Sequence, residues 1–139
     1  MRKIRRERLA ILAVLVGFAD CGSPVRQGWP SDLSAALGRS VTVEGRAVNM
    51  KLGAVIEGEG GHLWIDGLDS WPEDLCKNGD QGKRVRVTGT LIERHDLPVR
   101  YPFKEGEHPV AAIIVPEGTD LYAASRRFLL KDARWTLAQ

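Results

Sequence analysis

The chain has 139 residues, with 20 Lys and Arg, 18 Asp and Glu, and two Cys. Five of the basic residues and one acid lie in the first 19 positions, so the remainder carries 15 basic and 17 acidic residues and a net charge of −2. The length suits one domain with a real core and is too short for two. A net-negative remainder lacks the basic surface typical of nucleic-acid binding, so the composition disfavours a nucleic-acid partner.

The N-terminus has the layout of a secretory signal peptide, which we place at residues 1–19. Residues 2–8 hold five Lys and Arg, and residues 9–19 form an unbroken run of small and apolar side chains. A basic block followed by a short apolar run is typical of export signals. The run is about half the length that spans a bilayer, roughly 20 residues. We therefore expect an exported protein of the periplasm or cell envelope.

Two processing routes are open after the apolar run. Ala19 fits cleavage by the small-residue rule, whereas Cys21 stands where a bacterial lipoprotein would be lipidated. Asp20 and Phe18 depart from the lipoprotein pattern. Residues 20–36 contain several Gly and Pro and are interpreted as a linker or tether. Cys21 and Cys76 form a disulfide in one alternative; lipidation of Cys21, or two thiols, are the others.

Two segments with the same pattern define the expected fold. Residues 38–45 (GRSVTVEG) and 82–89 (GKRVRVTG) share G-[RK]-x-V-x-V-x-G. The alternating Val residues predict strands with one face inward, and the final Gly45 and Gly89 predict a bend or close backbone approach. Strongly bent strands are typical of a small closed barrel.

Shorter elements lie between and after these segments. Residues 53–57 and 62–66 predict a hairpin around the Gly-rich turn 58–61. Ser70 and Glu73 form a capping box with Pro72 early, which predicts a short helix over 71–76. The second patterned segment extends as a strand over 83–94. A Pro-punctuated insertion at about 94–127 holds a strand at 111–115 and a helical turn at 120–127, and a final strand, bulged near Lys131 and Asp132, covers 128–137.

This order predicts a mainly β domain over residues 37–139: a five-stranded, OB-like Greek-key barrel with a short helix between strands three and four. The twin segments match the first and fourth strands, which are neighbours in that barrel. The chain resembles small exported bacterial OB-fold proteins of unassigned function. The insertion departs from a minimal OB barrel, and a small open β-sandwich is the alternative fold.

The residues that could support catalysis or metal binding form no recognisable pattern. His62, His95 and His108 are far apart in sequence and lack the tight spacings of zinc ligands. Asp66 and Asp69 are too few for a calcium loop. No nucleophile or phosphate-loop motif occurs. We therefore expect no enzyme activity, no catalytic residue, no metal and no cofactor.

A binding surface is predicted instead from strand phase. Trp64 alternates out of phase with its apolar neighbours, and Arg84 and Arg86 have the outward phase of their strand, so these three residues are the candidate binding patch. The expected function is an exported, non-enzymatic binding or interaction module of the cell envelope, whose partner is an envelope protein, a glycan or a small anionic ligand. It contacts the membrane only if Cys21 is lipidated. The alternatives are a nucleic-acid-binding OB domain and, less favoured, a hydrolase or metal enzyme.

Overall fold

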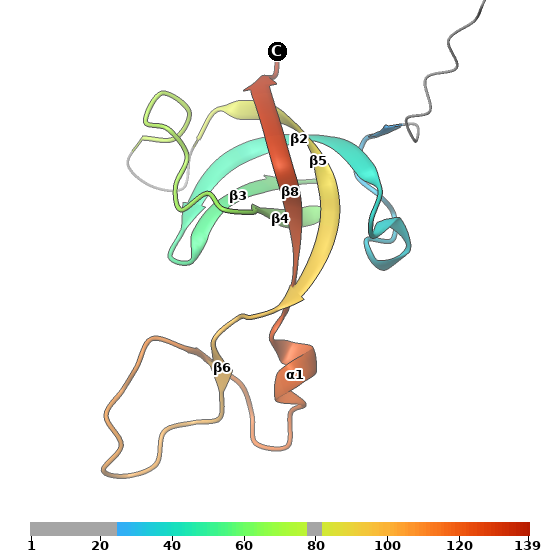
Figure 1. The fold of residues 1–139 in the computed structure, drawn as a ribbon. Helices are drawn as coiled ribbons and strands as arrows, with labels where there is room; N and C mark the ends of the chain where they lie inside the picture. The colour runs from blue at the N-terminus through green and yellow to red at the C-terminus, as the bar shows by residue number, and fades with distance from the viewer. Residues whose placement is uncertain (1–24, 78–81) are drawn as a thin grey trace, which may run out of the picture.

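The computed structural model describes residues 25–77 and 82–139 and is mainly β (Figure 1). The predicted signal peptide and Cys21 lie outside the described residues. No helix among the described residues is long and apolar enough to cross a membrane. The elements in chain order are β1 (Arg26–Gln27), the 3-10 helix η1 (Ser34–Ala36), β2 (Ser40–Met50), β3 (Gly53–Gly58), β4 (Gly61–Ile65), β5 (Arg84–His95), β6 (Val99–Arg100), β7 (Ile113–Ile114), α1 (Leu121–Ala124) and β8 (Arg126–Leu137).

Five strands close into a barrel in the order β2-β3-β4-β8-β5, with β5 returning to β2. All neighbours are antiparallel except β4 and β8, which run parallel. This mixed, closed barrel is consistent with an OB-like fold, and the open sandwich is wrong. The short β1 adds to β2 outside the closed ring, in parallel.

The twin glycine–valine segments lie side by side, as predicted. Val43 of β2 faces Val87 of β5 in an antiparallel ladder, and Gly45 faces Val85. Both Val43 and Val87 are fully buried in the main core. A side chain at Gly45 would collide with the backbone carbonyl of Glu57. Gly45 therefore allows β2 to bend and to change its partner from β5 to β3 next to Arg46.

The predicted helix over 71–76 is wrong; the segment forms a single turn. The N–H groups of Leu75 and Cys76 both donate to the Pro72 carbonyl, and no residue of 71–77 is helical. The Trp71 N–H donates instead to Asn49 Oδ1 of β2. The core buries Trp71, Leu75 and Cys76, and this burial holds the segment in place as a turn. A helix of a single turn would be marginal on its own.

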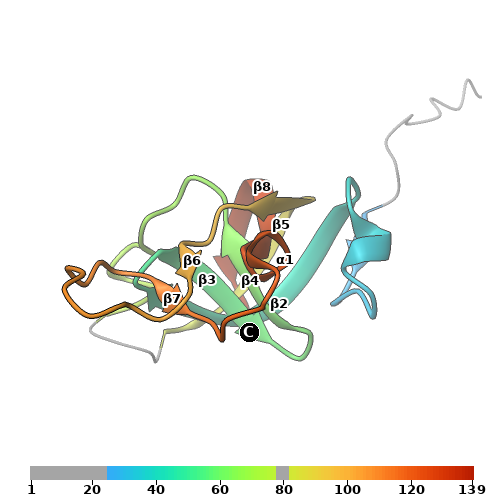
Figure 2. The same cartoon turned by 90° about the horizontal axis from the view of Figure 1, so that it is seen from below.

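Residues 96–125 form an arm that projects from one end of the barrel (Figures 1 and 2). The predicted strand at 111–115 is reduced to β7, which pairs in parallel with β6 of the arm and not with the barrel. The predicted helical turn is α1, where the Asp120 carboxylate accepts from the N–H groups of Tyr122 and Ala123. It is the one α-helix among the described residues, and it stands near the C-terminus.

The last strand, β8, follows the arm and carries the predicted bulge. Its register against β5 shifts between Thr88 and Thr90, where Asp132 adopts a positive φ of 52°. On either side of the bulge the inward phase is kept, because Leu130 faces Leu91 and Trp135 faces Val87. Trp135 packs edge-to-face on Trp71, which closes the core beneath the 71–76 turn.

Candidate anion-binding site

Trp64 has the predicted phase but is not exposed. It points away from the main core, into a second cluster with Val55 and Leu129, and only 7% of it is accessible. Leu97 of the arm packs against this cluster. The Arg127 guanidinium lies 5.2 Å from the Trp64 ring and donates two hydrogen bonds to Asp96, which fixes it there. Trp64 is therefore covered by neighbouring side chains.

Arg84 and Arg86 are exposed on β5, as their phase predicts, with 61% and 55% of their side chains accessible. Both approach one carboxylate, that of Glu44 on β2. Arg86 donates from Nε and Nη2 to Glu44 Oε1 at 2.8 and 2.5 Å, and Arg84 Nη2 lies 3.7 Å from Oε2. These hydrogen bonds and charges from Arg86, with a smaller contribution from Arg84, hold the pKa of Glu44 below its usual range.

The two arginines line a surface hollow of about 530 Å³ that contains Trp29, and not Trp64. The structure therefore does not bring the three predicted patch residues together. Trp64 lines other hollows, together with Arg127. Thr42 and Glu44 of β2 complete the inner wall beside Arg84 and Arg86, and Glu59 comes from the β3–β4 turn. An aromatic plane beside two guanidinium groups is present, but Trp29 supplies it.

Trp29 is placed by the backbone of β2 and by two glycines. Gly28 N–H donates to the Thr42 carbonyl, and Trp29 Nε1 donates to the Glu44 carbonyl at 2.8 Å. A Cβ at Gly58 or Gly60 would lie only 2.7 or 2.5 Å from atoms of the Trp29 side chain. The glycines of the predicted hairpin turn thus provide room for the indole, and part of the predicted linker packs on the barrel.

Thr42 is one of the polar residues that alternate with the valines of residues 38–45, a pattern that predicts a solvent-facing side chain, but only 7% of it is accessible. It points outward from the barrel, where its hydroxyl lies 2.7 Å from the Thr88 hydroxyl of β5. Around Thr42, β1 pairs with β2, and Trp29 lines the same hollow as Thr42. Alternation along β2 therefore identifies the face of Thr42 but not its exposure.

Further cations share the outer face of these strands. Residues that face each other in a ladder point to the same side of the sheet. Arg134 of β8 faces Thr88, Lys131 faces Thr90, and Arg46 of β2 faces Arg84. We define the basic face as the exposed side chains of Arg46, Arg84, Arg86, Lys131 and Arg134.

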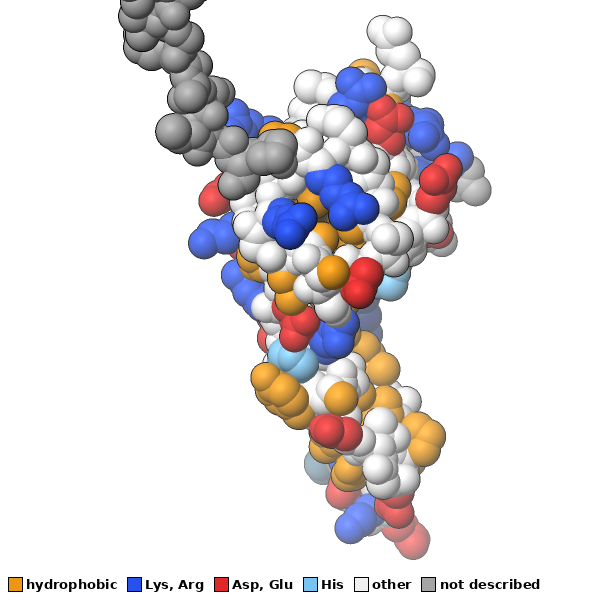
Figure 3. Space-filling view, turned by 90° about the vertical axis from the view of Figure 1, so that its right-hand side faces the viewer, with side chains coloured by type: hydrophobic (Ala, Val, Ile, Leu, Met, Phe, Trp, Pro, Cys, Tyr) orange, Lys and Arg blue, Asp and Glu red, His pale blue; other side chains and the backbone are white. Residues whose placement is uncertain are grey.

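Charge on the basic face is only partly compensated by acids, one of which is Glu57, opposite Arg46 in the β2–β3 ladder. Four other arginines each meet an acid: Arg94 with Asp66, Arg100 with Glu107, Arg126 with Glu93, and Arg127 with Asp96. On the basic face, Arg84 and Arg86 share one carboxylate. Within the described residues, Lys131 and Arg134 have no ion pair. Figure 3 shows Lys and Arg side chains spread over the barrel, whereas hydrophobic side chains gather on the arm below it.

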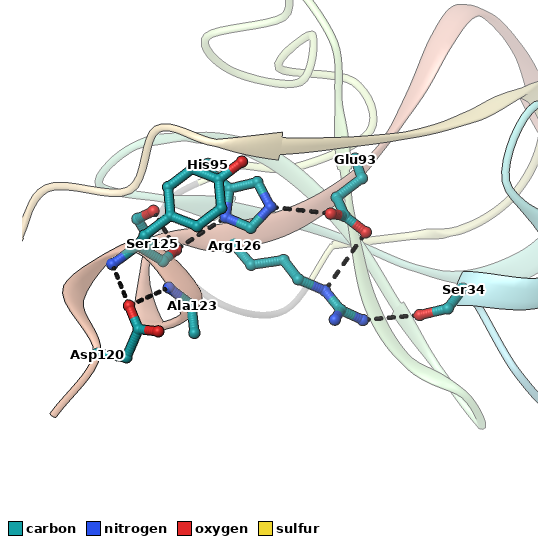
Figure 4. A network of polar contacts seen from close by, with 8 residues as sticks. Ser34, Glu93, His95, Asp120, Ala123, Ser125 and Arg126 are labelled. Atoms are coloured by element: carbon teal, nitrogen blue, oxygen red, sulfur yellow. Dashed lines mark hydrogen bonds and ion pairs between the residues drawn. The ribbon is translucent and has the colours of Figure 1, made fainter.

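The histidines are not brought together, and within the described ranges no three His, Cys, Asp or Glu side chains form a group that could hold a metal ion. His95 instead joins the arm to the barrel (Figure 4). Its Nδ1 lies 2.8 Å from the Tyr122 carbonyl and its Nε2 lies 2.9 Å from Glu93, and its ring stacks on the Tyr122 ring. Both partners are acceptors. The Tyr122 carbonyl and, to a smaller degree, Glu93 raise the pKa of His95.

Sequence reasoning found Arg84 and Arg86 but missed Trp29, Glu44, Lys131 and Arg134. The alternating pattern of residues 38–45 already places Glu44 on the outward face of its strand. Lys131 and Arg134 stand on either side of the β8 bulge, which breaks simple alternation. Cys76, which the sequence offered as a disulfide partner of Cys21, is buried. Comparison of the chain with family models, curated proteins and solved structures gives no match.

Proposed function

We propose that this protein is an exported, non-enzymatic binding module of the cell envelope that binds an anionic ligand at Arg84 and Arg86. One observation carries the proposal: the two guanidinium groups share a single carboxylate in a hollow beside Trp29. The N-terminal sequence supports export, and Cys21 offers the alternative of a lipid anchor. Envelope proteins, glycans and small anions remain the partner classes that the sequence indicated.

The chemistry of the hollow suits carboxylate or phosphate groups. A guanidinium presents a planar fork of donors that binds such groups in a bidentate manner. Arg86 uses Nε and Nη2 on Glu44, which leaves Nη1 for a ligand, and Arg84 is only loosely paired. Trp29 adds a flat apolar wall. Glu44 holds the arginines in place and also competes with an incoming anion.

A nucleic-acid-binding domain is the second candidate, and the basic face favours it. The net charge of −2 after residue 19 opposes it. Single-stranded nucleic acids are usually held by aromatic side chains on which the bases stack. Among the described residues, Trp29 is the aromatic side chain that lines the hollow, and no second one lines it. We therefore favour a ligand recognised by its negative charge.

The proposal is tested by calorimetric titration of the purified protein with citrate. Arg84→Gln/Arg86→Gln should weaken binding about tenfold or more, because hydrogen bonds to charged groups contribute about 1.5–3 kcal/mol each. Glu44→Gln should strengthen it by releasing both arginines. Arg100→Gln, which removes a paired arginine on the arm, is the matched control. Equal affinity of the double variant and the control would refute the proposal.

Export is tested separately by intact-mass analysis of envelope fractions. The mature chain should begin at Asp20 or, with an added lipid mass, at Cys21. Recovery of the protein only from the cytosol and only at full length would refute export while leaving the anion-binding result untouched.

A further inference from the structure

We propose that the basic face binds an extended acidic polysaccharide running along β5 and β8; this rests on the proposed function, because the chain would begin at Arg84 and Arg86. The proposal comes from the positions of the cations along the ladder. The proposed site is the outer face of β2, β5 and β8. The outer face of β4, where Leu97 of the arm packs against the Trp64 cluster, is not part of it.

Cations recur at successive levels of the ladder. Lys131 stands level with Thr90, Arg134 with Thr88, and Arg86 with Thr136. Arg84 stands at the next level, opposite Arg46. Levels two residues apart are separated by about 6.6 Å, so the face extends over roughly 20 Å. A linear polymer that carries negative charges at regular intervals would meet a cation at each level.

The face also keeps a net positive charge. Glu44 and Glu57 stand within the ladder, opposite Arg86 and Arg46. Glu59 lines the hollow, and Asp132 stands exposed at the bulge. With the five cations of the basic face, these four acids leave a net charge of +1. A net positive surface on a protein that is otherwise net negative attracts ligands of negative charge.

The neutral side chains between the cations favour a sugar polymer over a nucleic acid. Ser40, Thr88, Thr90 and Thr136 place hydroxyl groups among the charges, at ladder positions that point outward. Hydroxyls donate and accept hydrogen bonds, as sugar hydroxyls do. None of the outward ladder positions from Ser40 to Arg46, from Arg84 to Thr90 or from Lys131 to Thr136 is aromatic, so bases would find no stacking partner along the face.

The test compares ligands of different length and chemistry on one protein. The probes are polygalacturonate, galacturonate monosaccharide, neutral dextran and an oligothymidylate, titrated at several salt concentrations. Lys131→Gln/Arg134→Gln should weaken polygalacturonate binding about tenfold and lower the magnitude of the salt slope, since two fewer contacts release fewer counterions. Monosaccharide binding should stay unchanged, and dextran should not bind.

The outcomes separate this inference from the proposed function. If Arg84→Gln/Arg86→Gln abolishes binding of citrate and galacturonate but Lys131→Gln/Arg134→Gln leaves polygalacturonate binding and its salt slope unchanged, the polymer site is refuted and the proposed function stands. If oligothymidylate binds as tightly as polygalacturonate at equal salt, the polysaccharide assignment is overturned. Both substituted side chains are exposed, and matching melting curves would show that the variant is folded.

Discussion

The indole Nε1 of Trp29 donates a 2.8 Å hydrogen bond to the backbone carbonyl of Glu44, the residue whose carboxylate pairs with both Arg84 and Arg86. A segment from outside the predicted domain thus completes the wall of the candidate site. Glu44 therefore acts twice at the site: its backbone carbonyl holds the indole of Trp29, and its carboxylate holds the guanidinium groups.

Trp29 and Gly60 should depend on each other for stability. Gly60→Ala places a Cβ about 2.5 Å from the indole, and such overpacking typically costs about 1–3 kcal/mol. In a Trp29→Ala background the obstacle is gone, so the same Gly60→Ala change should cost much less. Denaturant unfolding of the wild type, both single variants and the double variant gives the coupling free energy. Additive effects would show that the indole does not lie on Gly60.

Substitutions along β2 should separate core positions from covered outer positions. Val43→Asp should abolish folding, because it buries an unpaired charge against Val87. Thr42→Asp should also be strongly destabilising, since Thr42 is buried against Thr88. Thr136→Asp, at an exposed outward position on β8, is the control and should change the melting temperature little. Circular dichroism melts decide this, and a Thr42→Asp variant as stable as the control would contradict the burial.

Removal of the Trp64 side chain should act on stability and not on anion binding. Because Trp64 packs against Val55 and Leu129 under Arg127, Trp64→Ala should cost about 3–5 kcal/mol. Citrate affinity of the folded variant should match that of the wild type. A marginal stability change combined with weaker binding would return Trp64 to the binding site.

The arm should loosen as the pH rises. The pKa of His95 is raised in the folded protein above its usual value of 6.5, because the Tyr122 carbonyl and Glu93 both accept hydrogen bonds from the ring. The stability from the protonated ring is therefore fully present below about pH 6.5 and is lost as the pH rises through the folded pKa. Arg126, which also pairs with Glu93, opposes this protonation without cancelling the shift.

Melting temperatures from pH 5 to 9 test the His95 contact. The wild type should lose stability across the upper part of this range, and His95→Gln should remove that loss. His62→Gln is the matched control and should retain the wild-type profile. Identical pH profiles for wild type and His95→Gln would show that another group titrates.

The barrel could be predicted from the sequence because two of its strands have a recognisable local pattern. The alternating valines and terminal glycines of residues 38–45 and 82–89 predict two bent, half-buried strands that are neighbours in the barrel. The structure pairs these strands, with Val43 opposite Val87. The 71–76 segment misled the prediction because a capping box has the same appearance before a helix and before a single turn. Its outcome was set by burial of Trp71 and Leu75, which local sequence does not reveal.

The site was only partly predictable for a related reason. Strand phase placed Arg84 and Arg86 on the outer face, but phase says nothing about what covers that face. Trp64 has the same outward phase and is covered by Arg127 and by Leu97 of the arm. Trp29 lies in a segment without periodicity, and its position depends on glycines about 30 residues later.

The central claim, that anions bind at Arg84 and Arg86 beside Trp29, is tested most directly by amide and indole chemical shifts during a citrate titration. The account predicts that the largest shifts fall on the Trp29 indole N–H, on Glu44 and on the arginine side chains of the hollow, and that they saturate together. Largest shifts around Trp64 and Arg127, with the Trp29 indole unmoved, would contradict it.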